Sequence, residues 1–183
     1  MTKIRTTGKV FAVLLSLAPF PFVGAAETPA YVDGSKPFIE IKDIKRQAET
    51  WAVCAASYDI MATIMEARDP ARSRQLGDLA NGAKVAVGMT LAINDLDPDI
   101  SPEKFAALWT ESNVAMAEWP QAQLTSILAE AEASGAEGAE EFGKKINATV
   151  VTCINNLKGQ RWYIDTWKEL IDSGLLKLPE NSP

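Results

Sequence analysis

Hydrophobic residues recur along most of the chain at alternating spacings of three and four, which is typical of α-helices. The clearest stripe starts near Glu40, where a helix is expected to begin, and it consists of Ile41, Ile44, Ala48, Trp51, Ala55, Tyr58, Ala62 and Met65. Val53, Ile60 and Ile64 lie on nearly the opposite side of the same helix. Because a helix that is apolar on both sides is usually buried, we expect this one to be central.

The starts of the next two helices are marked by a capping residue followed by proline. Asp69 precedes Pro70, and Ser101 precedes Pro102. A short polar side chain caps a helix start, and proline suits the first helical position. The second helix is expected to end near Ile93, and its glycines indicate close approach of a neighbouring helix: Gly77, Gly82 and Gly88.

The remaining apolar pattern predicts a third helix up to Ser134 and a last helix that ends near Ser173. Pro120 should kink or split the third helix, and residues 135–138 should form a linker. The apolar residues of the last helix share one face if this helix continues through Gly159. No strand pattern is present. The sequence therefore predicts an all-α, four- to five-helix bundle in one domain (residues 40–174), preceded by an extended arm (26–39) and followed by a tail (175–183).

The first 25 residues have the pattern of a signal peptide. Lys3, Arg5 and Lys9 precede a short apolar run, and the segment ends in small residues around Ala25. This order of a positive segment, an apolar segment and a small-residue cleavage site is typical of secretory signals. We expect removal of residues 1–25 and a periplasmic or secreted location in a bacterium. The apolar run is too short for a membrane span, so no membrane insertion is expected after cleavage.

The two cysteines, Cys54 and Cys153, fall in the first and last predicted helices. An even number of cysteines in an oxidising compartment favours a disulfide, and these two can form only one intrachain bond. The alternative is a pair of buried free thiols. We expect one inter-helix disulfide, Cys54–Cys153.

Charge and histidine content exclude several function classes. The first 25 residues hold three of the 18 basic residues and none of the 24 acidic ones, so the mature chain would carry a net charge of −9. Such a chain is repelled by nucleic acid and by anionic lipid. The chain contains no histidine. Mechanisms that need histidine, such as Ser-His-Asp hydrolysis and His-ligated zinc, are therefore excluded.

Two short segments resemble functional motifs. Residues 95–103 resemble an EF-hand calcium loop in placing oxygen-bearing side chains at alternate positions, from Asp95 to Glu103. The resemblance ends where Ile100 replaces the glycine of the turn and Ala106 replaces the last glutamate. The alternative is an acidic turn between helices. Glu111-Ser112 resembles the Glu-Ser pair of lytic transglycosylases, whose glutamate is the general acid and base, but the downstream Gly-Leu-Met-Gln element of those enzymes is absent.

Carboxylates within the helices are the other candidates for acid–base chemistry. Asp59 follows Tyr58, and Asp165 lies two residues after Tyr163. Buried carboxylates with a raised pKa act as acids or bases in many enzymes. The alternative is that each one pairs with a cation or an indole N–H group. A carboxylate-based hydrolase built on Asp59 or Glu111 is accordingly one functional hypothesis.

The strongest candidate for a binding surface is aromatic and consists of Arg161, Trp162 and Tyr163. If the last helix is unbroken, Ile164 and Trp167 face the core, Tyr163 flanks it and Trp162 points to solvent. An exposed tryptophan beside an arginine is typical of a protein-binding hot spot. If the helix breaks at Gly159, the change of phase buries Trp162 instead.

The sequence thus favours a non-catalytic protein without a cofactor, catalytic residues or a metal site. Its expected partner is another envelope or secreted protein, which it would bind as an inhibitor, an immunity protein or an accessory subunit. The alternative is a carrier of a small hydrophobic ligand, which requires a pocket between the helices.

Overall fold

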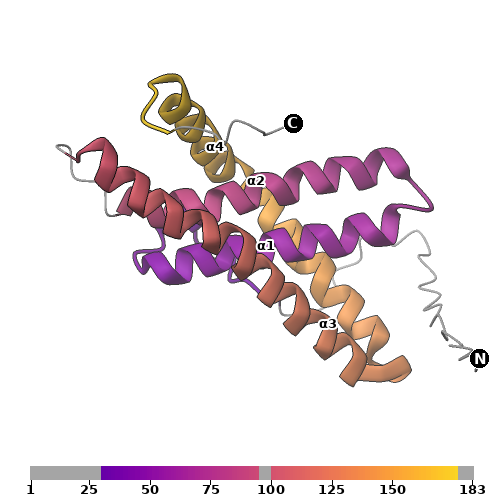
Figure 1. Ribbon diagram of the computed structural model, residues 1–183. Coiled ribbons are helices and arrows are strands. Elements are labelled where there is room, and N and C mark those ends of the chain that lie inside the picture. The colour runs from indigo at the N-terminus through magenta and orange to yellow at the C-terminus, as the bar shows by residue number, and fades with distance from the viewer. Residues whose placement is uncertain (1–29, 95–99, 177–183) are drawn as a thin grey trace, which may run out of the picture.

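The computed structural model describes residues 30–94 and 100–176, and every regular element in these ranges is helical (Figure 1). A short 3-10 helix, η1 (Phe38–Glu40), is followed by α1 (Ile44–Met65), α2 (Pro70–Asn94), α3 (Pro102–Asn155) and α4 (Leu157–Asp172). The prediction of an all-α helical bundle is confirmed. The predicted signal peptide lies outside the described residues, as does the tail from residue 177.

The helices α1 and α2 form an antiparallel pair in the middle of the molecule (Figure 1). As predicted, Asp69 caps α2, since its carboxylate accepts a hydrogen bond from the backbone nitrogen of Arg72 at 3.0 Å. The start of α1 was predicted four residues too early. Asp43 caps α1 by accepting from the backbone nitrogen of Arg46 at 3.0 Å, so the regular helix begins at Ile44.

The helix α3 consists of two limbs that meet at Gly135. Gly135 has φ 59° and ψ −164°, which is a left-handed backbone conformation that favours glycine. The first limb (residues 102–134) lies in front of the α1–α2 pair in Figure 1, and the second limb (136–155) returns behind it. The predicted split at Pro120 is wrong, because the helical backbone continues through that buried residue. The predicted linker shrinks to Gly135 alone.

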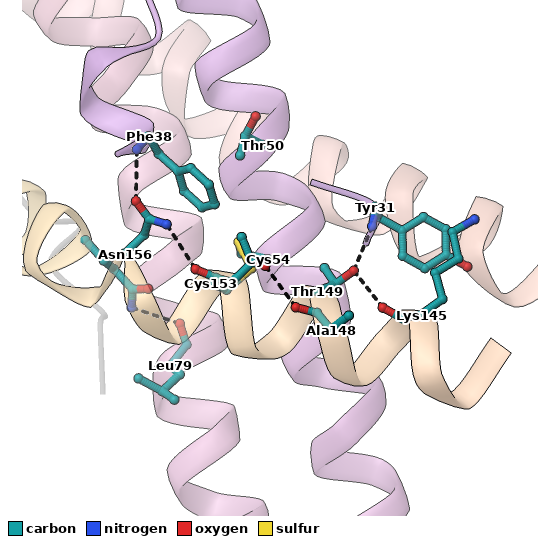
Figure 2. Close-up of a disulfide and its surroundings, with 12 residues drawn as sticks. Tyr31, Phe38, Thr50, Cys54, Leu79, Lys145, Ala148, Thr149, Cys153 and Asn156 are labelled. Atoms are coloured by element: carbon teal, nitrogen blue, oxygen red, sulfur yellow. Dashed lines mark hydrogen bonds between the residues drawn. A yellow bond between two sulfur atoms is a disulfide. The ribbon is translucent and has the colours of Figure 1, made fainter. Parts of the chain in front are cut away.

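The disulfide joins α1 to the second limb of α3 (Figure 2). The Cα atoms of Cys54 and Cys153 lie 5.7 Å apart, and both residues are completely buried. The bond joins positions that are 99 residues apart in the chain. Closing a loop of this size stabilises a fold by about 4–5 kcal/mol in the chain-entropy account. The predicted inter-helix disulfide is thus confirmed.

The arm before α1 is tied to the second limb of α3 by hydrogen bonds. The backbone nitrogen of Tyr31 donates to Thr149 Oγ1 at 2.8 Å, and that of Phe38 donates to Asn156 Oδ1 at 2.9 Å (Figure 2). Gln47 Nε2 then donates to the Phe38 carbonyl at 2.7 Å. These contacts hold the ring of Phe38 completely buried in the core.

One apolar core extends through the bundle. Buried residues of the arm, both limbs of α3 and the three other helices belong to a single cluster, which includes Phe38, Trp51, Ala83, Ile127, Ile146 and Tyr163. Among the helices that the structure describes, none is long and apolar enough to cross a membrane.

Candidate functional site

The orientation of α4 is set by a break in the helix at Asn156. This residue has φ −101° and ψ 8°, and α4 begins directly after it. The sequence left open whether the last helix is continuous through Gly159. The helix α4 does run through Gly159, but the break at Asn156, three residues earlier, separates it from α3. Because the break changes the helical phase, Tyr163 is buried with 5 % of its surface exposed. Ile164 and Trp167, which were expected to face the core, are only partly buried.

The break does not bury Trp162, which remains 51 % exposed. Its ring lies edge-on to that of Tyr163, with ring centroids 4.9 Å apart. Tyr163 lies edge-on to Trp51 at 6.1 Å, and Trp51 to Phe38 at 5.0 Å. Edge-to-face pairs of this kind are favourable beyond the area that they bury. A continuous row of aromatic rings thus supports the exposed tryptophan from the core outward.

A second exposed apolar side chain, that of Ile39, lies against the first turn of α4. Ile39 is 51 % exposed, and its Cγ2 atom lies 2.9 Å from the position that a Cβ atom on Gly159 would occupy. Gly159 precedes Trp162 by one turn of α4. Ile39 therefore covers the turn of the helix before Trp162, and it can do so because residue 159 has no side chain.

The charges around Trp162 are mainly basic. Lys158 and Arg161 are exposed and lie one turn apart on α4. Asp165 forms an exposed ion pair with Lys168, whose nitrogen lies 3.7 Å from the carboxylate. We name Ile39, Lys158, Arg161 and Trp162 the Trp162 surface. It is an apolar and basic surface on an acidic protein.

A separate groove lies between the start of α1, the end of α2 and the first limb of α3. It encloses about 340 Å³ and is open to solvent. Its apolar lining includes Ile44, Leu91, Leu108, Ala115 and Trp119. The volume is at the small end of the range of ligand pockets in proteins. The groove is therefore a place in the described residues where a small ligand could fit.

Two carboxylates border this groove. Glu111 and Glu118 both line it and are exposed, whereas Ser112 lines it as a buried residue. The sequence analysis identified Glu111 and Ser112 but missed Glu118. The sequence feature that could have identified Glu118 is its spacing of seven residues from Glu111. This spacing places both residues on the same face of a helix, two turns apart. The exposure of both carboxylates suits binding, because a general acid is usually held in a dry pocket that raises its pKa.

The other candidates for acid–base chemistry or metal binding take part in contacts that hold the helices. Asp59 forms an ion pair with Lys84, at 3.0 Å, which links α1 to α2. Of the predicted calcium loop, residues 95–99 lie outside the described part of the chain. Ser101, at its end, caps α3 by accepting from the backbone nitrogen of Lys104 at 3.3 Å. Within residues 30–94 and 100–176, no three acidic or cysteine residues are grouped in a way that could hold a metal ion.

Comparison of the chain with protein-family models, with the curated proteins and with the solved structures found no match. Only the residues of this chain and their arrangement therefore bear on its function.

Proposed function

We propose that this protein is an exported, non-catalytic binding protein that holds another envelope or secreted protein through the Trp162 surface. The observation that carries the proposal is the exposure of Trp162 on a row of aromatic rings that extends into the core. A tryptophan whose ring is already fixed loses little conformational freedom when it binds. Fixed aromatic residues of this kind are therefore typical hot spots of protein interfaces.

The charges of the Trp162 surface suggest the chemistry of the partner. Lys158 and Arg161 are both exposed beside Trp162. An acidic rim around an apolar pocket on the partner would complement them, with the indole ring in the pocket. Exposed charges at the edge of an interface mainly affect the association rate and its salt dependence. Binding should therefore weaken with salt but persist, because the tryptophan contributes an apolar part that salt does not screen.

Export is supported by two features. The first 25 residues have the pattern of a signal peptide, and the structure contains a disulfide that joins distant parts of the chain. Stable disulfides are typical of proteins in oxidising compartments. The proposal of a non-catalytic role rests on the absence of histidine from the sequence and on the exposure of the carboxylates in the groove.

The test is capture of the partner with tagged mature protein (residues 26–183) from periplasmic extract, followed by binding measurements with the purified partner. Trp162→Ala should weaken the complex by about 2 kcal/mol or more, which is roughly 30-fold in Kd. Leu128→Ala is the matched control, since Leu128 is an equally exposed apolar residue on the first limb of α3.

A partner that is retained at moderate salt, is lost with Trp162→Ala and is kept with Leu128→Ala would support the proposal. Equal binding by the wild type and Trp162→Ala would refute it. Failure to capture any stoichiometric partner would also count against a binding protein of this kind.

A further inference from the structure

The groove between α1, α2 and the first limb of α3 has features that the proposed function does not use. We propose that it binds a linear aliphatic amine with a cationic group at each end, such as a long-chain diamine or polyamine. This binding site is independent of the Trp162 surface. Three observations carry the proposal: the apolar lining, the two carboxylates at the rim and an unpaired hydroxyl group in the floor.

The lining of the groove selects an apolar ligand body. Leu91 of α2 and Ile44 of α1 face the first limb of α3, which contributes Leu108, Ala115 and Trp119 to the same space. An extended methylene chain placed there would remove apolar surface from water on both sides. Each buried methylene group contributes about 0.8 kcal/mol when it is fully removed from water.

The charges at the rim select a cation. Glu111 and Glu118 are the charged residues among those that line the groove. Neither carboxylate forms an ion pair with a lysine or arginine in the described part of the chain. Two unpaired carboxylates beside an apolar groove attract ammonium groups and repel fatty acids and other anions.

The spacing of the carboxylates indicates the length of the ligand. Residues seven apart on one helix lie about 10.5 Å apart along its axis. A diamine with about eight methylene groups can therefore place one ammonium group at Glu111 and the other at Glu118 while its chain lies along Ala115. A short diamine can reach only one of the two.

The floor offers a further polar contact. Ser112 lines the groove, and only 4 % of its surface is exposed. Its hydroxyl group forms no hydrogen bond with the residues that the structure describes, and it is not among the polar atoms that are sealed in the core. A hydroxyl group that remains accessible beside a groove can bond to a ligand or to an ordered water. A secondary amine in the middle of a polyamine chain could form this bond.

The experiment is titration calorimetry of the mature protein with 1,8-diaminooctane, compared with octylamine, 1,3-diaminopropane and octanoate. The long diamine should bind up to about fivefold more tightly than octylamine, since it gains a second, exposed charge pair worth at most about 1 kcal/mol. The short diamine should bind more weakly than the long one, and octanoate should not bind.

The variants Glu111→Gln and Glu118→Gln should each lower the affinity for 1,8-diaminooctane by up to about fivefold and make it similar to that for octylamine. Both residues are exposed, so the variants should fold normally. Glu132→Gln, at an exposed glutamate elsewhere on α3, is the matched control and should bind like the wild type.

Trp119→Phe tests whether the ligand lies in the groove, because a ligand that is only attracted to the acidic surface would not depend on Trp119. The variant should remove the change in tryptophan fluorescence on binding, because Trp119 lines the groove. No binding of 1,8-diaminooctane would overturn the proposal, as would equal affinity for the long and short diamines. An equal loss of affinity in Glu132→Gln would overturn it too, since it would show attraction to the acidic surface in general.

Discussion

The side-chain oxygen of Asn156 accepts a hydrogen bond from the backbone nitrogen of Phe38, at 2.9 Å and across 118 residues of sequence. Its side-chain nitrogen donates to the carbonyl of Thr152 at 3.0 Å. The same residue forms the break between α3 and α4. One asparagine therefore links the arm to the junction of two helices, and through this junction it affects the orientation of α4.

Replacing Asn156 with alanine should lower the free energy of unfolding by about 1–3 kcal/mol, because the partly buried N–H group of Phe38 loses its acceptor. Urea denaturation measures this difference. Asn155→Ala is the matched control, since Asn155 is the exposed neighbour in the chain, and it should change stability by no more than about 0.5 kcal/mol. Similar losses in the two variants would contradict this role of Asn156.

Two glycines of α2 should respond to alanine in opposite directions. A Cβ atom on Gly77 would meet nothing within 4 Å, so Gly77→Ala should stabilise the protein by about 0.5–1 kcal/mol through helix propensity. A Cβ atom on Gly82 would collide with Gln160 Nε2, which donates to the carbonyl of Leu79 at 3.0 Å. Gly82→Ala should therefore destabilise it by about 1–3 kcal/mol. Thermal unfolding of both variants is the measurement, and a stabilising Gly82→Ala would show that α4 is not packed closely on α2.

The stability of the protein should fall as the pH rises above about 10. Burial raises the pKa of all three tyrosines, Tyr31, Tyr58 and Tyr163, above the usual value of 10.0. Below pH 10 the phenol groups are protonated in both the folded and the unfolded state, so their contribution to stability is fully present. Above it the unfolded chain loses phenolic protons that the native protein keeps, so unfolding becomes easier.

The ultraviolet absorbance of the phenolate groups, followed together with circular dichroism as the pH is raised, measures this effect. The native protein should show phenolate absorbance only where helical structure is lost. The chain unfolded in guanidinium is the control and should titrate near pH 10. Phenolate formation near pH 10 with intact helices would contradict the burial of these tyrosines.

Features with local causes could be predicted from the sequence. The starts of α2 and α3 follow from Asp69 and Ser101, whose side chains bond to backbone groups only three residues away. The disulfide was predictable for a different reason, since two cysteines can form only one intrachain bond. The close approach of a neighbouring helix was correctly predicted at Gly82 and Gly88 but was wrong at Gly77, which no neighbour contacts.

Features with distant causes could not be predicted in this way. Pro120 was the stronger local signal for a break in α3, yet the chain reverses at Gly135. The break at Asn156 coincides with a contact to Phe38 that exists only after the arm has folded onto the bundle. The sequence pattern around Gly159 contains no sign of that contact.

For the candidate sites, the sequence by itself determined the residue types: an arginine beside a tryptophan in α4, and glutamates seven apart in α3. It also determined the helical class of the fold, because hydrophobic periodicity is a property of the chain alone. Only the tertiary structure decided that Trp162 is exposed and that Glu118 borders a groove. The physical reason is that exposure depends on the phase at which each helix packs, and that a groove is formed by side chains from helices far apart in the sequence.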